Sequence, residues 1–161
     1  MHWLDPAGVP TLGDYFRAAG YRTLYHDKWH VSHADLLDPE GEPVASTDRR
    51  GEPLKEPVAA YAQAARLEPF GFSGWIGPEP HGAEPGNSGL RRDPFFAAQA
   101  LASLDALEAE RRRSSSAPPW LMVCSLVNPH DIVLFGLAWL RVRALFKDSS
   151  VPKIEPPTTR S

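Results

Sequence analysis

The apolar positions of residues 12–19 follow the spacing of an α-helix. They lie three or four residues apart, at Leu12, Tyr15, Phe16 and Ala19. Thr11 precedes them as a candidate N-cap, and Asp14 lies in the first turn, where the helix dipole favours a carboxylate. Gly20 suits the left-handed position that commonly follows a helix. The pattern predicts a helix that leads directly into the next element.

A strand is predicted immediately after Gly20. The run from Tyr21 to Tyr25 is rich in aromatic and β-branched side chains, and it leads into a segment with a lysine and several histidines. If the backbone stays extended, Lys28 and His30 lie on the same side of it, because side chains alternate with a period of two. An ammonium group beside an imidazole can bind an anion or transfer a proton. This pair is therefore the first candidate for function.

A second strand is predicted from Trp120 to Val127. An apolar run of this length between turn signals is typical of a strand buried on both faces, which is a central and parallel strand. It ends at Asn128-Pro129-His130-Asp131. Ligands of open α/β sheets bind beyond the carboxyl ends of the strands. We therefore expect His130 to lie near Lys28 and His30.

Two further helices complete an α/β pattern. Pro57 suits the first turn of a short helix over residues 58–67. Asp93 is the expected N-cap of the longest helix, with Pro94 at its first position. The apolar stripe of that helix comprises Phe96, Ala97, Ala100, Leu101, Leu104 and Leu107. The segments rich in glycine and proline, at residues 34–55 and 70–92, are predicted to be loops.

Composition sets limits on the class of protein. The chain has 161 residues, of which 42% are hydrophobic, and this suits one domain; its net charge of −3 gives no sign of a nucleic-acid-binding face. The single cysteine, Cys124, excludes an internal disulfide, and its apolar surroundings predict a buried, unreactive thiol. No signal peptide is recognised, so a cytoplasmic location is the default expectation. A membrane span is not expected, because polar residues 128–131 interrupt the apolar region 120–140.

The C-terminal part of the chain divides into two segments. Residues 132–145 are apolar, and a helix there would expose a large hydrophobic surface, which makes self-association an expectation. Residues 147–161 are proline-rich and aperiodic, and we expect an irregular tail. The predicted domain therefore spans residues 1–146.

The histidines also allow a metal-binding hypothesis. The imidazoles of His26, His30 and His33 are groups that coordinate zinc. On an extended strand, however, His26 and His30 are too far apart for one ion unless the backbone bends. The alternative is that His26 and His33 are ordinary surface histidines. Both interpretations remain open from the residues alone.

Two segments together resemble the sulfatase family. The chain from Thr11 to Thr23, followed by Lys28-Trp29-His30, is similar to a sulfatase segment in which a helix, an Ala-Gly-Tyr turn and a strand precede Gly-Lys-Trp-His. Asn128-Pro129-His130-Asp131 resembles the Pro-His segment further along in these enzymes. The resemblance covers residues 9–135. It implies the fold of the alkaline phosphatase superfamily, a three-layer α/β sandwich with a central mixed, mainly parallel sheet between helices.

The activity that the resemblance implies is hydrolysis of a small-molecule sulfate ester. In sulfatases a formylglycine, made from cysteine or serine, attacks sulfur beside a calcium or magnesium ion. By resemblance, Lys28 contacts the sulfate oxygens, while His30 and His130 bind the substrate or transfer protons. Such residue types suit this chemistry, because fixed cations and donors stabilise charge that develops on a sulfuryl group.

The chain also departs from the family pattern. Asp27 stands where sulfatases usually have glycine, and a carboxylate there can repel a sulfate or pair with Lys28. The nucleophile motif, Cys or Ser-x-Pro-x-Arg, is absent from the sequence, as are the aspartate and asparagine motifs that hold the metal. The chain thus resembles an interior slice of a sulfatase catalytic domain, and we expect it to hydrolyse nothing alone. The alternative function is non-catalytic, as an anion-binding or interaction remnant.

Overall fold

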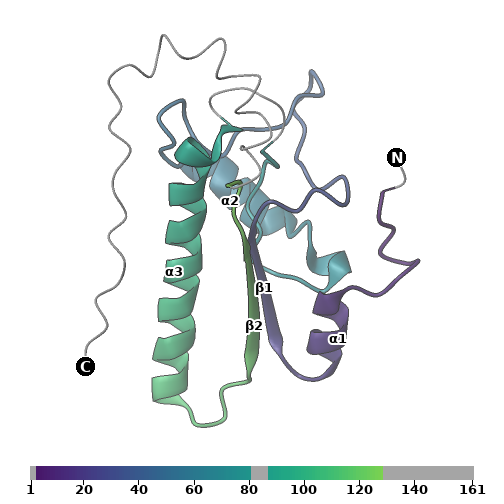
Figure 1. The fold of residues 1–161 in the computed structure, drawn as a ribbon, viewed down its shortest axis with the longest axis vertical. Coiled ribbons are helices and arrows are strands. Elements are labelled where there is room, and N and C mark those ends of the chain that lie inside the picture. Colours follow the sequence, from purple (N-terminus) through teal and green to yellow (C-terminus); the bar gives the residue numbers. More distant parts are fainter. Residues whose placement is uncertain (1–2, 81–86, 129–161) are drawn as a thin grey trace.

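The computed structural model describes residues 3–80 and 87–128 of the chain. In chain order the elements are α1 (Leu12–Ala18), β1 (Arg22–Asp27), α2 (Lys55–Ala64), the short 3₁₀ helix η1 (Glu68–Phe70), α3 (Gly89–Arg113) and β2 (Trp120–Ser125). Figure 1 shows the two strands side by side, with α2 and the long loops around the end at which both strands finish. The protein is a mixed α/β structure.

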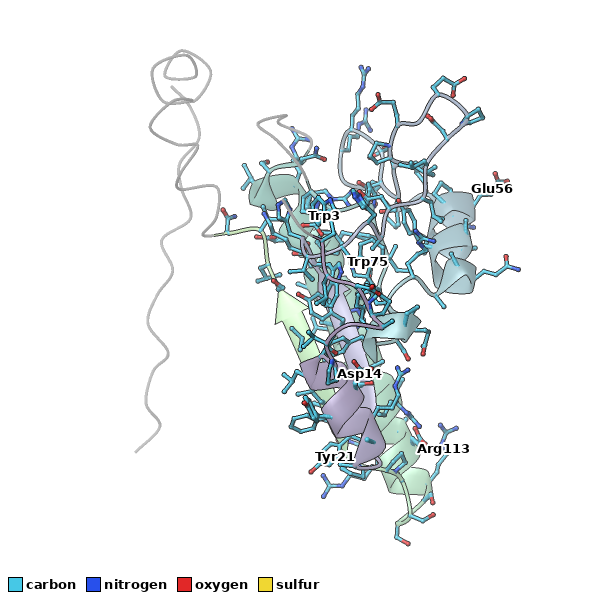
Figure 2. All side chains as sticks on the ribbon, turned by 90° about the vertical axis from the view of Figure 1, so that its right-hand side faces the viewer. Trp3, Asp14, Tyr21, Glu56, Trp75 and Arg113 are labelled. Carbon is cyan, nitrogen blue, oxygen red and sulfur yellow. The ribbon has the colours of Figure 1, made fainter. Side chains whose placement is uncertain are left out.

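The two strands pair in parallel, as the sequence predicts. The register places Arg22 opposite Trp120 and Asp27 opposite Ser125. Helices α1 and α3 lie on opposite sides of the strands, which is evident when Figure 1 is compared with the perpendicular view in Figure 2. The second edge of β1 is also occupied, because Tyr25 N donates to Ser73 O at 3.0 Å and Ser73 N donates to Thr23 O at 3.0 Å.

Helix α1 confirms the prediction made from its spacing and caps. Thr11 Oγ1 accepts a hydrogen bond from Asp14 N at 3.3 Å, and Thr11 N donates to Asp14 Oδ2 at 2.7 Å. These reciprocal bonds form a capping box, which satisfies two of the backbone donors at the helix start. Gly20 adopts a φ of 84°, the left-handed conformation expected after the helix.

Helix α2 begins and ends three residues earlier than predicted. Pro57 does lie in its first turn, where a missing backbone N–H costs no helical hydrogen bond. The helix nevertheless starts at Lys55, after an extended Leu54 that makes no side-chain cap. It ends at Ala65, whose φ of 47° is left-handed, and this releases Leu67 to pack in the core.

Helix α3 starts at Gly89, so the prediction of Asp93 as its N-cap is wrong. The carboxylate of Asp93 instead accepts hydrogen bonds from Val127 N at 2.7 Å and Asn128 N at 3.1 Å, at the end of β2. The Asp93 carboxylate thus accepts backbone N–H groups, as an N-cap does, but these belong to residues after β2 and not to the first turn of a helix. Pro94 consequently lies inside the helix.

Strand β2 is parallel but not buried on both faces, which contradicts the second half of its prediction. Within the described residues it pairs only with β1, and most of its side chains are half-buried. Trp120 is 45% exposed, and Cys124 is a free, exposed cysteine. An apolar run therefore identified the strand but not its position in the sheet, since no other described strand lies beside it.

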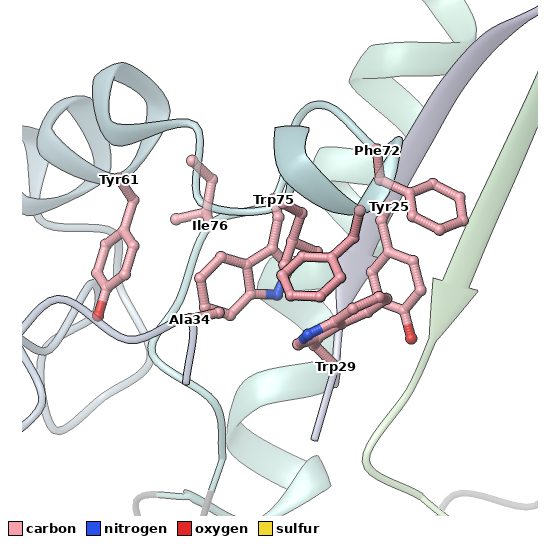
Figure 3. Packing of buried hydrophobic residues seen from close by; sticks show 9 residues of the cluster. Tyr25, Trp29, Ala34, Tyr61, Phe72, Trp75 and Ile76 are labelled. Atoms are coloured by element: carbon pink, nitrogen blue, oxygen red, sulfur yellow. The ribbon is translucent and has the colours of Figure 1, made fainter. Parts of the chain in front are cut away.

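The hydrophobic core surrounds the carboxyl end of β1 and is mainly aromatic (Figure 3). The ring of Tyr25 packs against Trp29 at a centroid distance of 5.1 Å and against Phe72 at 5.3 Å. Trp75 packs edge-on against Tyr61 at 5.7 Å. Trp29 lies between Lys28 and His30 in sequence, so its burial anchors the predicted functional segment to the core.

Several predictions concern residues outside the described part of the chain. These are the position of His130, the apolar segment 132–145 and the tail 147–161. Among the residues that are described, no helix has both the length and the apolar character needed to cross a membrane.

Candidate functional site at the carboxyl edge of the sheet

The carboxyl ends of β1 and β2 bring two distant segments together. Because the strands are parallel and Asp27 pairs with Ser125, the residues that follow each strand leave the same edge of the sheet. The backbone N–H of Lys28 also donates to Ser125 O at 3.0 Å. Lys28 and the residues that follow it therefore lie beside the residues that follow β2.

The backbone does not remain extended through the histidine-bearing segment. Asp27 has a φ of 74° and His30 a φ of 50°, both in the left-handed region. The condition under which Lys28 and His30 would share one side of a strand is therefore not met, because β1 ends at Asp27. Glycine adopts such a left-handed φ without steric cost, whereas an aspartate does so only occasionally.

Glu79, about 50 residues further along the chain, binds the backbone of the Lys28–His30 segment. The Oε2 atom of Glu79 accepts hydrogen bonds from Trp29 N at 2.7 Å and from His30 N at 2.9 Å. Its Oε1 atom lies 3.4 Å from His30 Nδ1. Glu79 N in turn donates to Asp35 Oδ1 at 2.7 Å. One buried carboxylate thus binds two consecutive backbone N–H groups with one oxygen and faces an imidazole nitrogen with the other.

Asp27 is buried without a hydrogen bond to its carboxyl group. The residue is 1% exposed, and neither carboxyl oxygen has a partner among the described residues. Burial raises the pKa of Asp27 from 3.8 to about 8, and the nearby carboxylate of Asp93 adds to this rise while Arg92 opposes it. The Asp27 carboxyl is therefore mainly protonated at pH 7, and it neither repels an anion nor neutralises Lys28.

Arg92, in the first turn of α3, is a buried cation near the carboxyl ends of the strands. It is 3% exposed, and its guanidinium donates to Thr47 Oγ1 at 2.6 Å and to Pro78 O at 3.1 Å. The guanidinium carbon lies 4.9 Å from the centre of the Phe96 ring, a cation–π contact. Burial lowers the pKa of Arg92, and the charge of Asp27, when ionised, is the largest effect that raises it again.

His30 borders an open hollow of about 500 Å³ near the N-terminal segment. Its side chain is 47% exposed, and its ring lies edge-on to Trp3 at a centroid distance of 6.3 Å. The hollow is lined by Trp3, Leu4, Asp5, Gly8, Val9, His30 and Val31. An apolar surface beside an imidazole can accommodate the organic part of a ligand whose polar group contacts His30.

The described histidines do not converge on a metal. His26 is buried, which contradicts the prediction of a surface residue, and burial lowers its pKa; His33 is exposed, as predicted. Among residues 3–80 and 87–128, no group of three or more histidine, cysteine, aspartate or glutamate side chains could hold a metal ion. Neither the zinc hypothesis nor a calcium or magnesium site therefore finds a donor set in this part of the chain.

Cys124 differs from its prediction in exposure but not in the direction of its pKa. The thiol is exposed rather than buried in a core. Partial desolvation raises its pKa, and the neighbouring Asp27 and Asp93 act in the same direction. A raised pKa lowers the fraction of nucleophilic thiolate at neutral pH.

Sequence reasoning missed most of the residues that shape this edge. Glu79 and Arg92 carry no motif, and Asp93 was assigned to a helix cap; each of the three contacts a partner more than 13 residues away in the chain. For Glu79 there was one local signal, because it stands between Pro78 and Pro80 in a segment rich in aromatic residues. Prolines on both sides restrict the backbone and so favour a fixed position for the carboxylate.

Comparison of the chain with protein-family models, curated proteins and solved structures found no match. The resemblance to sulfatases consequently remains a prediction from the two sequence segments.

Proposed function

We propose that this chain carries the oxyanion-binding part of a sulfatase-type sulfate-ester site, formed by Lys28, His30 and His130. The observation that supports it best is the parallel register of Asp27 with Ser125, together with the hydrogen bond from Lys28 N to Ser125 O. This arrangement brings Lys28 and His30 beside the segment that continues into Asn128. His130 follows two residues later, outside the described residues.

The charges around the edge are compatible with an anionic ligand. Asp27 has a pKa of about 8 and is mainly neutral at pH 7. The carboxylates of Glu79 and Asp93 are engaged by backbone N–H groups. The ammonium group of Lys28, and the imidazole of His30 when it is protonated, can then donate to sulfate oxygens, which is how enzymes stabilise charge on a transferring group.

Sulfate is expected to stabilise the protein through Lys28. A ligand at ten times its dissociation constant adds about 1.4 kcal/mol to the free energy of unfolding. We expect such a gain for the wild type in millimolar sodium sulfate, compared with sodium chloride of equal ionic strength, and its loss in Lys28→Ala. Lys55→Ala is the matched control, because Lys55 is an exposed lysine at the start of α2. Equal sulfate effects in all three proteins would contradict the proposed anion site.

The chain alone is expected to show no sulfatase turnover. The nucleophile motif is absent from its sequence, and the described residues provide no metal site. The test is release of a nitrophenol from its sulfate ester with and without calcium, with an active sulfatase as positive control. Calcium-dependent release that survives repurification would overturn the expected inactivity.

A second candidate function is an interaction remnant. It is favoured by the outer edge of β2, which has no partner strand in the described residues; Trp120 at the start of the strand and Leu126 directly after it are exposed. An open strand edge without charged side chains favours pairing with another chain. Concentration-dependent self-association in sedimentation experiments, with no sulfate effect on stability, would favour this function over the oxyanion site.

A further inference from the structure

The two oxygens of Glu79 have different surroundings. Oε2 accepts the backbone hydrogen bonds of Trp29 and His30, at 2.7 and 2.9 Å. Oε1 is buried and accepts no hydrogen bond from the described residues, but it lies 3.4 Å from His30 Nδ1. A buried carboxylate oxygen without a donor is costly, by about 1–3 kcal/mol or more. The nearby imidazole nitrogen can supply that donor only if it carries a hydrogen.

Glu79 cannot easily turn away from His30. The residue is 7% exposed, and its own backbone N–H is held by Asp35 Oδ1 at 2.7 Å. The preceding carbonyl, Pro78 O, accepts a hydrogen bond from the buried Arg92 at 3.1 Å. The carboxylate is therefore held by contacts on its side chain, and the peptide bond that precedes Glu79 is held at both its N–H and its carbonyl oxygen.

We infer that Glu79 is a positioning residue that keeps a hydrogen on His30 Nδ1 and thereby leaves the lone pair of the neutral ring on Nε2. A carboxylate that faces one imidazole nitrogen selects the tautomer of the ring, because it accepts a hydrogen bond and cannot donate one when ionised. The role of Nε2 toward a sulfate ester depends on the proposed function, whereas the tautomer itself does not.

The tautomer of His30 can be measured directly. Long-range nitrogen–carbon correlation NMR on histidine-labelled protein distinguishes Nδ1–H from Nε2–H in a neutral ring. We expect Nδ1–H for His30 in the wild type, although a neutral imidazole can carry its proton on either nitrogen. Nε2–H in the wild type would overturn the inference, whatever the variants do.

Glu79→Gln tests the cause. Glutamine keeps one oxygen that can accept from the two backbone N–H groups, but it presents an amide NH₂ to Nδ1 in place of the second oxygen. Nδ1 then becomes the acceptor, and His30 is expected to change to Nε2–H. Glu68→Gln is the control, because Glu68 pairs with Arg17 at 2.6 Å on an exposed surface. An Nδ1–H tautomer that persists in a folded Glu79→Gln variant would show that Glu79 does not select it.

The same samples separate this inference from the proposed function. Glu79→Gln removes a negative charge beside the proposed oxyanion site and moves the hydrogen to His30 Nε2, so the stabilisation by sulfate should be kept or increased, while Glu68→Gln should leave it unchanged. Wild-type protein that shows Nδ1–H but no stabilisation by sulfate would support the positioning role and refute the sulfate site. Wild-type protein that binds sulfate with His30 as Nε2–H would do the opposite.

Discussion

Asp27→Asn is expected to remove most of the fall in stability that the wild type undergoes between about pH 4 and pH 8. The folded-state pKa of Asp27 is about 8, against an ordinary value of 3.8. Between these values the folded state binds a proton that the unfolded state has released, so the free energy of unfolding falls as pH rises. About four pKa units correspond to ~5 kcal/mol as an upper limit. We expect the variant to be more stable than the wild type by about 2–5 kcal/mol at pH 8, and not at pH 4.

Asparagine is a suitable replacement for two reasons. It is nearly the same size as aspartate without a carboxyl group to ionise, and it tolerates the left-handed φ of 74° at this position better than most residues. Urea unfolding at several pH values between 4 and 9 gives the profile, with Asp105→Asn as a control on the exposed face of α3. Parallel profiles for the wild type and Asp27→Asn would contradict the burial argument.

Ion-paired carboxylates do not obscure this result. The hydrogen bond from Arg22 holds the pKa of Glu110 below its ordinary value of 4.5. Its contribution to stability is therefore present above pH 4.5 and is lost only as the pH falls further. The ionisation of Glu110 therefore affects the wild type and the Asp27→Asn variant equally, and it occurs below the pH range in which Asp27 changes the stability.

The sequence predicted those features that local interactions determine. Helix α1 was predicted correctly because the capping box and the left-handed Gly20 are formed by residues within ten positions of one another. The parallel pairing of the strands was predicted from the apolar run at residues 120–127, although the same argument wrongly predicted that β2 is buried on both faces. The carboxyl edge was likewise predicted as the meeting place of two segments, and the structure brings Lys28 beside Ser125.

The sequence did not predict features that depend on distant partners. Asp93 has the residue type of an N-cap, yet its carboxylate binds the backbone at the end of β2. His26 looked like a surface residue because it is polar, but it lies at a buried position of β1. The left-handed turn at Asp27 could not be recognised, because aspartate rather than glycine occupies it. Each error has one cause, namely that burial and tertiary hydrogen bonds outweighed a local preference.

Arg92→Met is expected to lower the free energy of unfolding by about 2–4 kcal/mol. Methionine fills much of the space of the arginine stem but has no donors, so Thr47 Oγ1 and Pro78 O lose their hydrogen bonds. Each buried acceptor left unsatisfied costs about 1–3 kcal/mol. Arg91→Met is the matched control, because Arg91 is exposed and its guanidinium donates to Arg49 O at 2.9 Å; a change within ~0.5 kcal/mol is expected there. Equal losses in the two variants would show that the buried guanidinium is not required.

The loss caused by Arg92→Met should also depend on pH, and only when Asp27 is present. Below pH 8 the Asp27 carboxyl is mainly neutral, so Arg92 is held by its hydrogen bonds and the Phe96 ring. Above pH 8 Asp27 ionises, and the guanidinium then stabilises a buried carboxylate. The loss should therefore grow by roughly 1–2 kcal/mol between pH 6 and pH 9 in the wild-type background. In the Asp27→Asn background it should stay constant, because the group that couples pH to Arg92 has been removed.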